Sequence, residues 1–515
     1  MILDLLENGN QSRLALAVSG GGPKLTYDQL RAQVNRLIDE LRQAGLGRDD
    51  RIAMALPNGI EMIVSFLASS TVGTAAPLNP AYTRDEFRFY LEDTGARALI
   101  LPRQNTEEAR AAAGDNVLII ETDLDSEGRV KFSSAHNPAA ARTGNHPSPE
   151  DFALILHTSG TTSRPKRVPL SHANLMTSAR NVADTYKLTP EDVSLCVMPL
   201  FHVHGLVAST LATFFTGGTV VVPPKFNPLS FWPTVKEHRA TWYSAVPTIH
   251  QVLLSRTKAG ARPAGSEYLR FIRSCSAALA PQTMFDIEER FGVPILEAYG
   301  MTEAAHQMAS NPLPPGARKP GSVGRGTSVE IAILNKQGEE LPPGATGEVS
   351  IRGPNVFGGY EGNNEANAES FSNGWFRTGD QGYLDNEGYL TLVGRIKELI
   401  NRGGEKISPR EIDEVLMTHS AVAEAVCFGI SDRVYGEEVA AAVVLKDAAT
   451  EKELIAHCHS SLADFKCPKK IYIVEAIPRT ATGKIQRRNV ASACQNRERV
   501  ATGSWKPLVD LNDLG

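Results

Sequence analysis

The chain contains 515 residues, of which 42% are hydrophobic and 22% are charged. This composition excludes a disordered chain, a collagen-like repeat and a small disulfide scaffold, and the length suggests about two to four domains. The 53 basic and 58 acidic residues give a net charge of −5, so we expect no nucleic acid or anionic membrane as a partner.

The six cysteines are scattered and form no C-x-x-C pair, which is typical of reduced thiols in a cytosolic protein. The first residues lack the basic region of a secretory signal. Residues 205–224 carry no charge, but the Gly217-Gly218 break favours a buried helix, a turn and a strand over a membrane span. We therefore expect a cytoplasmic protein without a membrane span, as a monomer or a small homo-oligomer.

Between about residues 50 and 300, short apolar runs alternate with helical patterns. Ser171 is a suitable N-cap for a helix that continues to Tyr186, and Pro281 suits the first turn of another helix. This alternation predicts an α/β fold with mainly parallel sheets covered by helices. After about residue 320, short strands bounded by Gly and Pro predict a β-rich subdomain. A small α+β unit, with a helix over 409–417, follows a boundary near 395–398.

The most specific local feature is the loop Thr-Ser-Gly-Thr-Thr-Ser-Arg-Pro-Lys at 158–166, directly after a buried strand. Small hydroxyl residues and a glycine let backbone N–H groups approach phosphate oxygens, and Lys166 adds a charged donor. The loop is not a Walker A motif, because no G-x-x-x-x-G-K-[ST] occurs. Taken alone, a polar loop of this kind is more often only a loop.

The order of residues in this loop resembles the phosphate-binding loop of the acyl-adenylate-forming superfamily, which includes acyl-CoA synthetases, amino-acid adenylation domains and luciferases. Further segments that look like this family's motifs follow in the family's order, at 299–303, 375–380, 394–405 and 480–485. The resemblance extends over about residues 25–490, and so many motifs in register leave little room for chance.

In that family an acid and ATP form an acyl-AMP, and pyrophosphate leaves. This displacement needs charge neutralisation more than a covalent nucleophile. The resemblance assigns to the nucleotide the residues Thr158, Ser159, Gly160, Thr161, Thr162, Lys166, Ser276, Ala277, Ala278, Glu297, Ala298, Tyr299, Asp380 and Arg395. Glu303 and Thr161 would hold Mg²⁺. Thr302 would contact the α-phosphate, and Lys484 would bridge carboxylate and phosphate oxygens.

The resemblance also implies a second step, in which a thiol replaces AMP, and coenzyme A is the expected thiol. An N-terminal AMP-binding domain would cover residues 1–394, with the β-rich subdomain at 320–394. A mobile C-terminal α+β domain over 398–515 would swing about a hinge at 395–397, with Lys397 as the hinge residue. Gly403 and Gly404 would line the CoA channel, and His202 would gate the acid or the thiol. ATP, Mg²⁺ and CoA are the implied cofactors and co-substrates.

The acid pocket should be built from segments around 225–250, 274–279 and 300–308. A fatty acid requires apolar walls, whereas a second carboxylate requires donors. The polar residues here, His306 and Ser276 beside Arg273, favour a short dicarboxylate, and several segments look most similar to oxalate–CoA ligases. We therefore expect His306, Ser276 and His202 to contact oxalate. A core histidine bonded to the backbone is the alternative for His306.

Other readings stay open. His202 and His204 form an H-x-H pair that binds metal in some proteins, although no further ligand follows at a supporting spacing. Medium-chain, malonic and aromatic acids are rival substrates. Arg167 occupies the position after the loop lysine where most relatives have glycine, so it either reshapes the loop or points outward. That departure also leaves a nucleotide-binding pseudoenzyme as an alternative outside the enzymes.

Overall fold

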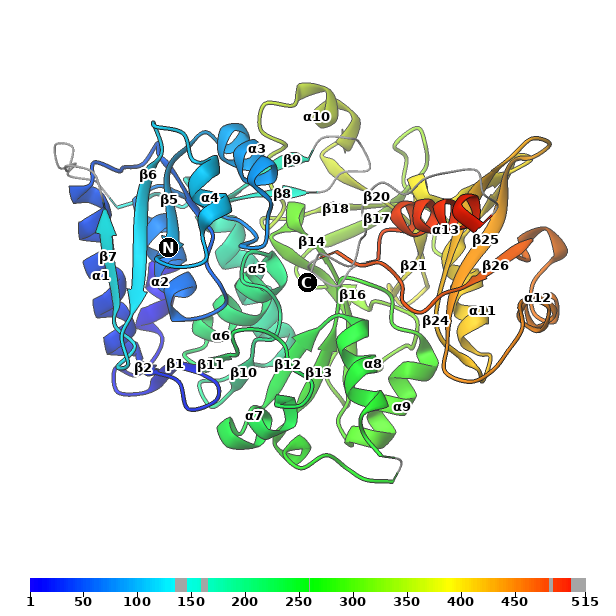
Figure 1. The fold of residues 1–515 in the computed structure, drawn as a ribbon, viewed down its shortest axis with the longest axis horizontal. Helices are drawn as coiled ribbons and strands as arrows, with labels where there is room; N and C mark the ends of the chain where they lie inside the picture. The colour runs from blue at the N-terminus through cyan, green and yellow to red at the C-terminus, as the bar shows by residue number, and fades with distance from the viewer. Residues whose placement is uncertain (135–145, 159–164, 259, 481–484, 502–515) are drawn as a thin grey trace. The chain divides into compact units, whose positions relative to one another are not determined.

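The computed structural model describes residues 1–134, 146–158, 165–258, 260–480 and 485–501 (Figure 1). The chain divides into two compact units. The first contains Met1–Gly344, Ser350–Thr378 and Leu384–Thr391, and the second contains Ala345–Val349, Gly379–Tyr383 and Leu392–Gly515. Helices alternate with large sheets, so the predicted α/β class is confirmed. The domain limits and the hinge stay predictions.

The N-terminal part of the first unit contains a seven-stranded sheet, in which the inner strands are parallel and both edge strands are antiparallel to their neighbours. In spatial order its strands are β7 (Val130–Ser134), β6 (Leu118–Leu124), β5 (Ala96–Pro102), β3 (Arg51–Met54), β4 (Thr74–Pro77), β8 (Phe152–Thr158) and β9 (Lys166–Ser171). The helices of this part are η1 (Ile2–Glu7), α1 (Tyr27–Gln43), α2 (Ile60–Val72), α3 (Arg84–Thr94) and α4 (Glu107–Ala112).

A nine-stranded sheet includes β15, which begins at the predicted acid-site residue His306, and β13, which ends two residues before Ser276 (Figure 1). In spatial order its strands are β16 (Arg325–Gly326), β15 (His306–Ser310), β14 (Ile295–Met301), β13 (Phe271–Ser274), β12 (Trp242–Ala245), β10 (Val193–Leu195), β11 (Thr219–Val222), β1 (Leu14–Val18) and β2 (Lys24–Thr26). The strands from β14 to β1 are parallel. Both β12 and β13 are buried throughout, as expected of strands that helices cover on both faces.

Helices connect these strands, and several begin and end where the sequence predicts. The connecting helices are α5 (His172–Tyr186), η2 (His204–Leu211), α6 (Ala212–Phe215), α7 (Phe231–His238), α8 (Pro247–Ser255), η3 (Ser266–Tyr268) and α9 (Pro281–Phe291). The side chain of Ser171 caps α5 by accepting from the backbone N–H of Asn174, and Pro281 opens α9. Residues 205–224 form a buried helix, a turn and strand β11, as predicted. Among the described residues, none of the helices combines the length and the apolar character that a membrane span requires.

Another five-stranded sheet has the order β17 (Glu330–Leu334), β18 (Gly347–Arg352), β20 (Trp375–Leu384) and β19 (Phe371–Ser372), with β21 (Leu390–Arg395) next to β20. Two further short helices are η4 (Thr302–Ala304), between β14 and β15 of the nine-stranded sheet, and α10 (Asn364–Ser370), directly before β19. Strands dominate here, in agreement with the Gly- and Pro-bounded pattern of the sequence.

The second unit has its own five-stranded sheet, in the order β23 (Glu405–Ile407), β22 (Ile400–Arg402), β25 (Gly436–Leu445) and β24 (Val422–Asp432), with β26 (Lys470–Ile473) next to β25. Its helices are η5 (Ile396–Glu398), α11 (Pro409–Met417), α12 (Glu451–His459), η6 (Asp464–Lys466) and α13 (Arg487–Ala501). Ile412, Leu416 and Leu454 from α11 and α12 join one buried cluster with sheet residues. The bounds of α11, Pro409–Met417, match the helix that the sequence predicts over 409–417.

All six cysteines are free and buried. Burial raises the pKa of Cys196 to about 11 and that of Cys458 to about 12. Burial, followed by the nearby Asp413 carboxylate, raises the pKa of Cys427 well above its ordinary value. These groups are therefore neutral thiols at physiological pH.

Candidate functional site

The two ends of the predicted phosphate loop are neighbours. Thr158 ends β8 and pairs directly with Lys166, the first residue of the antiparallel strand β9. The loop therefore connects two adjacent antiparallel strands, of which β9 is the edge strand of the sheet. The predicted residues Ser159, Gly160, Thr161 and Thr162 lie outside the described residues.

Tyr360 links this loop to the predicted magnesium ligand. The Lys166 ammonium lies 4.4 Å from the centre of the Tyr360 ring, a cation–π contact. The Tyr360 hydroxyl donates to the Glu303 carboxylate at 2.9 Å. Glu303 and Thr302 lie in η4 and are both buried. A buried carboxylate oxygen suits Mg²⁺, which prefers oxygen ligands. Sequence reasoning missed Tyr360, because its motif carries no spacing signal.

Two groups of residues assigned to the nucleotide lie on or directly after the adjacent parallel strands β14 and β13. Glu297, Ala298 and Tyr299 are buried on β14, and a Glu297 carboxylate oxygen accepts from the backbone N–H of Gly321 at 3.0 Å. Ser276, Ala277 and Ala278 follow β13, with both alanines exposed. This edge of a parallel sheet is where open α/β folds bind ligands.

The second unit contains the remaining assigned residues. The Arg395 guanidinium lies 3.0 Å from the Asp380 carboxylate, so this predicted pair is brought together. Lys397 lies in η5. Gly403 and Gly404 lie between β22 and β23, with φ angles of +59° and +99° that favour glycine. Lys484 lies outside the described residues.

The acid-site histidines form hydrogen bonds in a buried polar cluster. His204 Nδ1 lies 3.1 Å from Ser276 Oγ, and its Nε2 lies 2.6 Å from Ser244 Oγ. His202 Nδ1 accepts from the backbone N–H of His204 at 3.2 Å. No cluster of three or more His, Cys, Asp or Glu that could hold a metal ion occurs within the described ranges, so the H-x-H pair gains no support as a metal site.

Arg273, on β13, lies at the centre of this cluster and is fully buried. Its guanidinium donates to Ser244 Oγ at 3.0 Å, to His306 Nδ1 at 3.3 Å and to Gln307 Oε1 at 3.1 Å. Its Nε donates to the Tyr186 hydroxyl at 2.9 Å. The predicted pair His306 and Ser276 therefore belongs to one hydrogen-bonded network. His306 bonds to a buried arginine, not to the backbone as the alternative required.

Burial lowers the pKa of His306 and of His204 well below its ordinary value, and the Arg273 charge lowers both further. Both rings are therefore neutral at physiological pH. Their centres lie 5.1 Å apart. Around them Ser276, Ala305 and His306 have φ angles of +72°, +50° and +116°, which non-glycine residues adopt only at a cost.

Two family models match the chain: the AMP-binding enzyme over residues 6–361 and the AMP-binding enzyme C-terminal domain over residues 411–484. The chain belongs to the AMP-binding enzyme family. This finding confirms the family predicted from the motifs.

Curated relatives and solved structures agree with the family. An oxalate–CoA ligase of Arabidopsis thaliana is 49% identical over 505 residues, which cover 95% of this chain and 97% of the relative. An oxalate–CoA ligase of Saccharomyces cerevisiae is 48% identical over 474 residues, which cover 86% of this chain and 87% of the relative. The crystal structure of ATP-bound MatB from Rhodopseudomonas palustris matches with a TM-score of 0.86 at 31% identity, and covers 96% of this chain and 98% of that chain.

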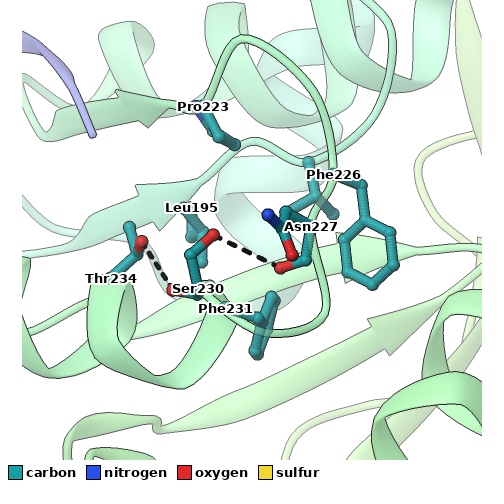
Figure 2. A pocket seen from close by; sticks show the side chains of 8 residues that line it. Leu195, Pro223, Phe226, Asn227, Ser230, Phe231 and Thr234 are labelled. Carbon is teal, nitrogen blue, oxygen red and sulfur yellow. Dashed lines mark hydrogen bonds between the residues drawn. The ribbon is translucent and has the colours of Figure 1, made fainter. Parts of the chain in front are cut away.

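A small cavity of this AMP-binding enzyme has none of these histidines among its lining residues (Figure 2). Its lining residues, which lie in and around β10, β11 and α7, are Leu195, Val197, Pro223, Phe226, Asn227, Ser230, Phe231 and Thr234. Its volume of about 10 Å³ holds roughly one water molecule, so it does not hold an acid. Of the predicted pocket segment 225–250, Ser244 contacts the acid-site cluster.

Arg167 of this AMP-binding enzyme forms ion pairs with two segments outside the loop, at Asp93 and Glu361. Its guanidinium lies 3.2 Å from the Glu361 carboxylate and 3.8 Å from the Asp93 carboxylate, and it also donates to the Asp93 carbonyl. Arg51 contacts the same Glu361 carboxylate. Arg167 is not among the residues with positive φ. It therefore tethers β9 to neighbouring segments without the backbone strain that a replaced glycine would cause.

Gly300→Ala should displace His306. A Cβ at position 300 would lie 2.1 Å from the His306 carbonyl oxygen and 3.1 Å from its Nδ1. Because misplacement by about 1 Å costs roughly 10²-fold in rate, we expect acid-dependent pyrophosphate release to fall by about that factor. Gly114→Ala, where the added Cβ meets no atom within 4 Å, is the control. Equal activity of the two variants would contradict this close approach.

Arg167→Gly should lower the stability of the protein without raising the kcat of the enzyme. Loss of these half-buried ion pairs should lower the free energy of unfolding by about 1 kcal/mol, measured by urea denaturation. Arg167→Ala separates the lost charge from the added flexibility of glycine. A higher kcat for Arg167→Gly would instead mean that the arginine impairs the loop.

Proposed function

We propose that this AMP-binding enzyme is an AMP-forming acid–CoA ligase and that its acid is oxalate. The observation that carries the choice of acid is the polar cluster in which His306 bonds to the buried Arg273 cation and Ser276 is linked to it through His204 and Ser244. Polar donors around a buried positive charge suit a small second carboxylate and oppose an alkyl chain. Both oxalate–CoA ligases named above, at 49% and 48% identity, support the same acid.

The proposed reaction has two displacements. A carboxylate oxygen of oxalate attacks the α-phosphorus of ATP, and pyrophosphate leaves. The sulfur of CoA then attacks the acyl carbonyl, AMP leaves, and the thiol proton is released. Lys166 and Lys484 would offset the negative charge that the first step gathers, because fixed cations need no reorganisation as charge develops.

Glu303 would hold Mg²⁺, and Tyr360, which donates to its carboxylate, would fix its orientation. Bound Mg²⁺ neutralises phosphate charge in displacements of this type. Asp380 is suited to accept from the ribose hydroxyls, and its ion pair with Arg395 keeps the carboxylate in one place. Gly403 and Gly404 offer a backbone that a thiol-bearing arm can approach closely.

The alternatives are a ligase for malonic, medium-chain or aromatic acids and, outside the enzymes, a nucleotide-binding pseudoenzyme. Arg167 motivated the pseudoenzyme, and its ion pair with Glu361 supports a structural role for this arginine instead. The cytoplasmic location and the monomer or small homo-oligomer stay predictions from the sequence.

Pyrophosphate release with ATP, Mg²⁺ and CoA should be fastest with oxalate among oxalate, malonate, hexanoate and coumarate. The expected cause is the donor-rich, buried cluster, which gains most from a second carboxylate close to the first. Preference for a longer acid would overturn oxalate but keep the ligase. Absence of acid-dependent pyrophosphate exchange with every acid would favour the pseudoenzyme.

His306→Ala should lower kcat/KM for oxalate by about 10²-fold, the usual loss for one buried donor to a reacting anion. His172→Ala is the matched control, because His172 is another buried histidine, bonded to the backbone N–H of Ile2. Full oxalate kcat/KM in His306→Ala would remove the role proposed for this residue.

A further inference from the structure

Arg273 is a fully buried cation whose four hydrogen-bond acceptors are all neutral: Tyr186, Ser244, Gln307 and His306. Across the part of the chain that the structure describes, no carboxylate forms an ion pair with it. Moving a charge out of water is unfavourable, and neutral acceptors offset this penalty without cancelling the charge. An anion bound nearby would therefore gain from this position.

The contact with Arg273 fixes where His306 carries its proton. A guanidinium only donates hydrogen bonds, so His306 Nδ1 must accept. In the neutral ring, the hydrogen then resides on Nε2. Nε2 is buried and has no hydrogen-bond partner among the described residues. His306 therefore offers a buried N–H donor that lacks an acceptor, which is costly unless a ligand supplies one.

A second path leads from Arg273 to Ser276. Ser244 Oγ accepts from Arg273 at 3.0 Å and lies 2.6 Å from His204 Nε2. When the Ser244 hydroxyl donates to His204 Nε2, every buried hydrogen in this path has an acceptor. When His204 Nε2–H donates to Ser244 instead, the hydroxyl hydrogen of Ser244 is buried without an acceptor, so we assign the first direction.

The direction of the hydrogen bond from Ser244 to His204 decides whether the Ser276 hydroxyl can donate to a ligand. With Nε2 as an acceptor, the neutral His204 ring carries its hydrogen on Nδ1 and donates to Ser276 Oγ at 3.1 Å. The hydrogen of the Ser276 hydroxyl is then free to point at a ligand acceptor. His306 and Ser276 thus both become donors through contacts that begin at Arg273.

We infer that Arg273 is the positioning residue that makes this enzyme select a doubly charged acid, because it orients both donors toward the second carboxylate and supplies the positive charge behind them. The inference rests on the proposed function and deepens it. A neutral amide in place of the second carboxylate presents hydrogens where the site also presents hydrogens, and it carries no charge. Discrimination between a carboxylate and its isosteric amide is the direct consequence.

The first test compares oxalate with oxamate, which replaces one carboxylate with an amide of the same shape. We expect the native enzyme to prefer oxalate in kcat/KM by at least about 10²-fold and Arg273→Met to lose most of that preference, as for removal of a buried donor set. Arg273→Lys keeps the positive charge but not the planar set of guanidinium donors, so it should retain part of the preference for oxalate. Tyr186→Phe is the control. It removes one hydrogen bond of Arg273, but Tyr186 belongs neither to the path to His306 nor to the path to Ser276. An unchanged oxalate-to-oxamate ratio in Arg273→Met would overturn the inference.

The second test needs no variant of Arg273, so it stands even if Arg273→Met fails to fold. Two-bond ¹⁵N–¹H correlation spectra of the ¹⁵N-histidine-labelled native protein report the tautomer, and His306→Gln assigns the signal. We expect His306 protonated on Nε2 and His204 on Nδ1. A His306 ring that carries its hydrogen on Nδ1, or a charged ring at pH 7, would overturn the inference.

The two tests separate this inference from the proposed function. A native enzyme that ignores oxalate while both tautomers are as expected would remove oxalate and keep the donor arrangement. A native enzyme that uses oxalate while Arg273→Met keeps the full preference over oxamate would keep the proposed function and remove the role of Arg273.

Discussion

The register of β12, β13 and β14 is the constraint on which the acid site depends. In the parallel pairing, Ser244 lies opposite Arg273, and Ser274 lies opposite Glu297. Strands that end at one edge of a sheet deliver their last side chains, and the loops that follow, to one place. A slip of one residue in β13 would turn Arg273 to the other face of the sheet. One register therefore sets the positions of the residues that we propose for both the acid and the nucleotide.

Strain and burial meet at the same place. Three non-glycine residues, Ser276, Ala305 and His306, have positive φ in the segments that follow β13 and η4, and each such conformation costs of order 1–3 kcal/mol. Such a cluster persists only where packing over-determines it. Here the buried strands β13, β14 and β15 supply the packing. Gln307 accepts from Arg273 through its side chain and from Asn355 through its backbone carbonyl, and these bonds fix the segment next to His306. The site is therefore held in shape before any substrate arrives, which lowers the cost of binding a small rigid acid.

Much of the fold could be predicted from local patterns. Ser171 and Pro281 marked helix starts, because a side-chain cap and a fixed φ act within one turn. Motif order identified the family, because several separated segments must each match. The contacts of Tyr360 and Gln307 could not be predicted, since they join residues far apart in sequence and no spacing rule links them. The sequence singled out His202 of the H-x-H pair, whereas His204 bonds to Ser276, because the helix start that follows Val203 decides which ring turns inward.

The buried cysteines have a consequence for an enzyme whose proposed co-substrate is itself a thiol. Exchange between a thiol and a disulfide requires an accessible thiolate. Cys196, Cys427 and Cys458 are fully shielded, and their raised pKa values keep them protonated. Oxidised coenzyme A would therefore find no nucleophile at these positions with which to form a mixed disulfide. The protein could work in a pool of free and oxidised coenzyme A without being modified by it at these three positions.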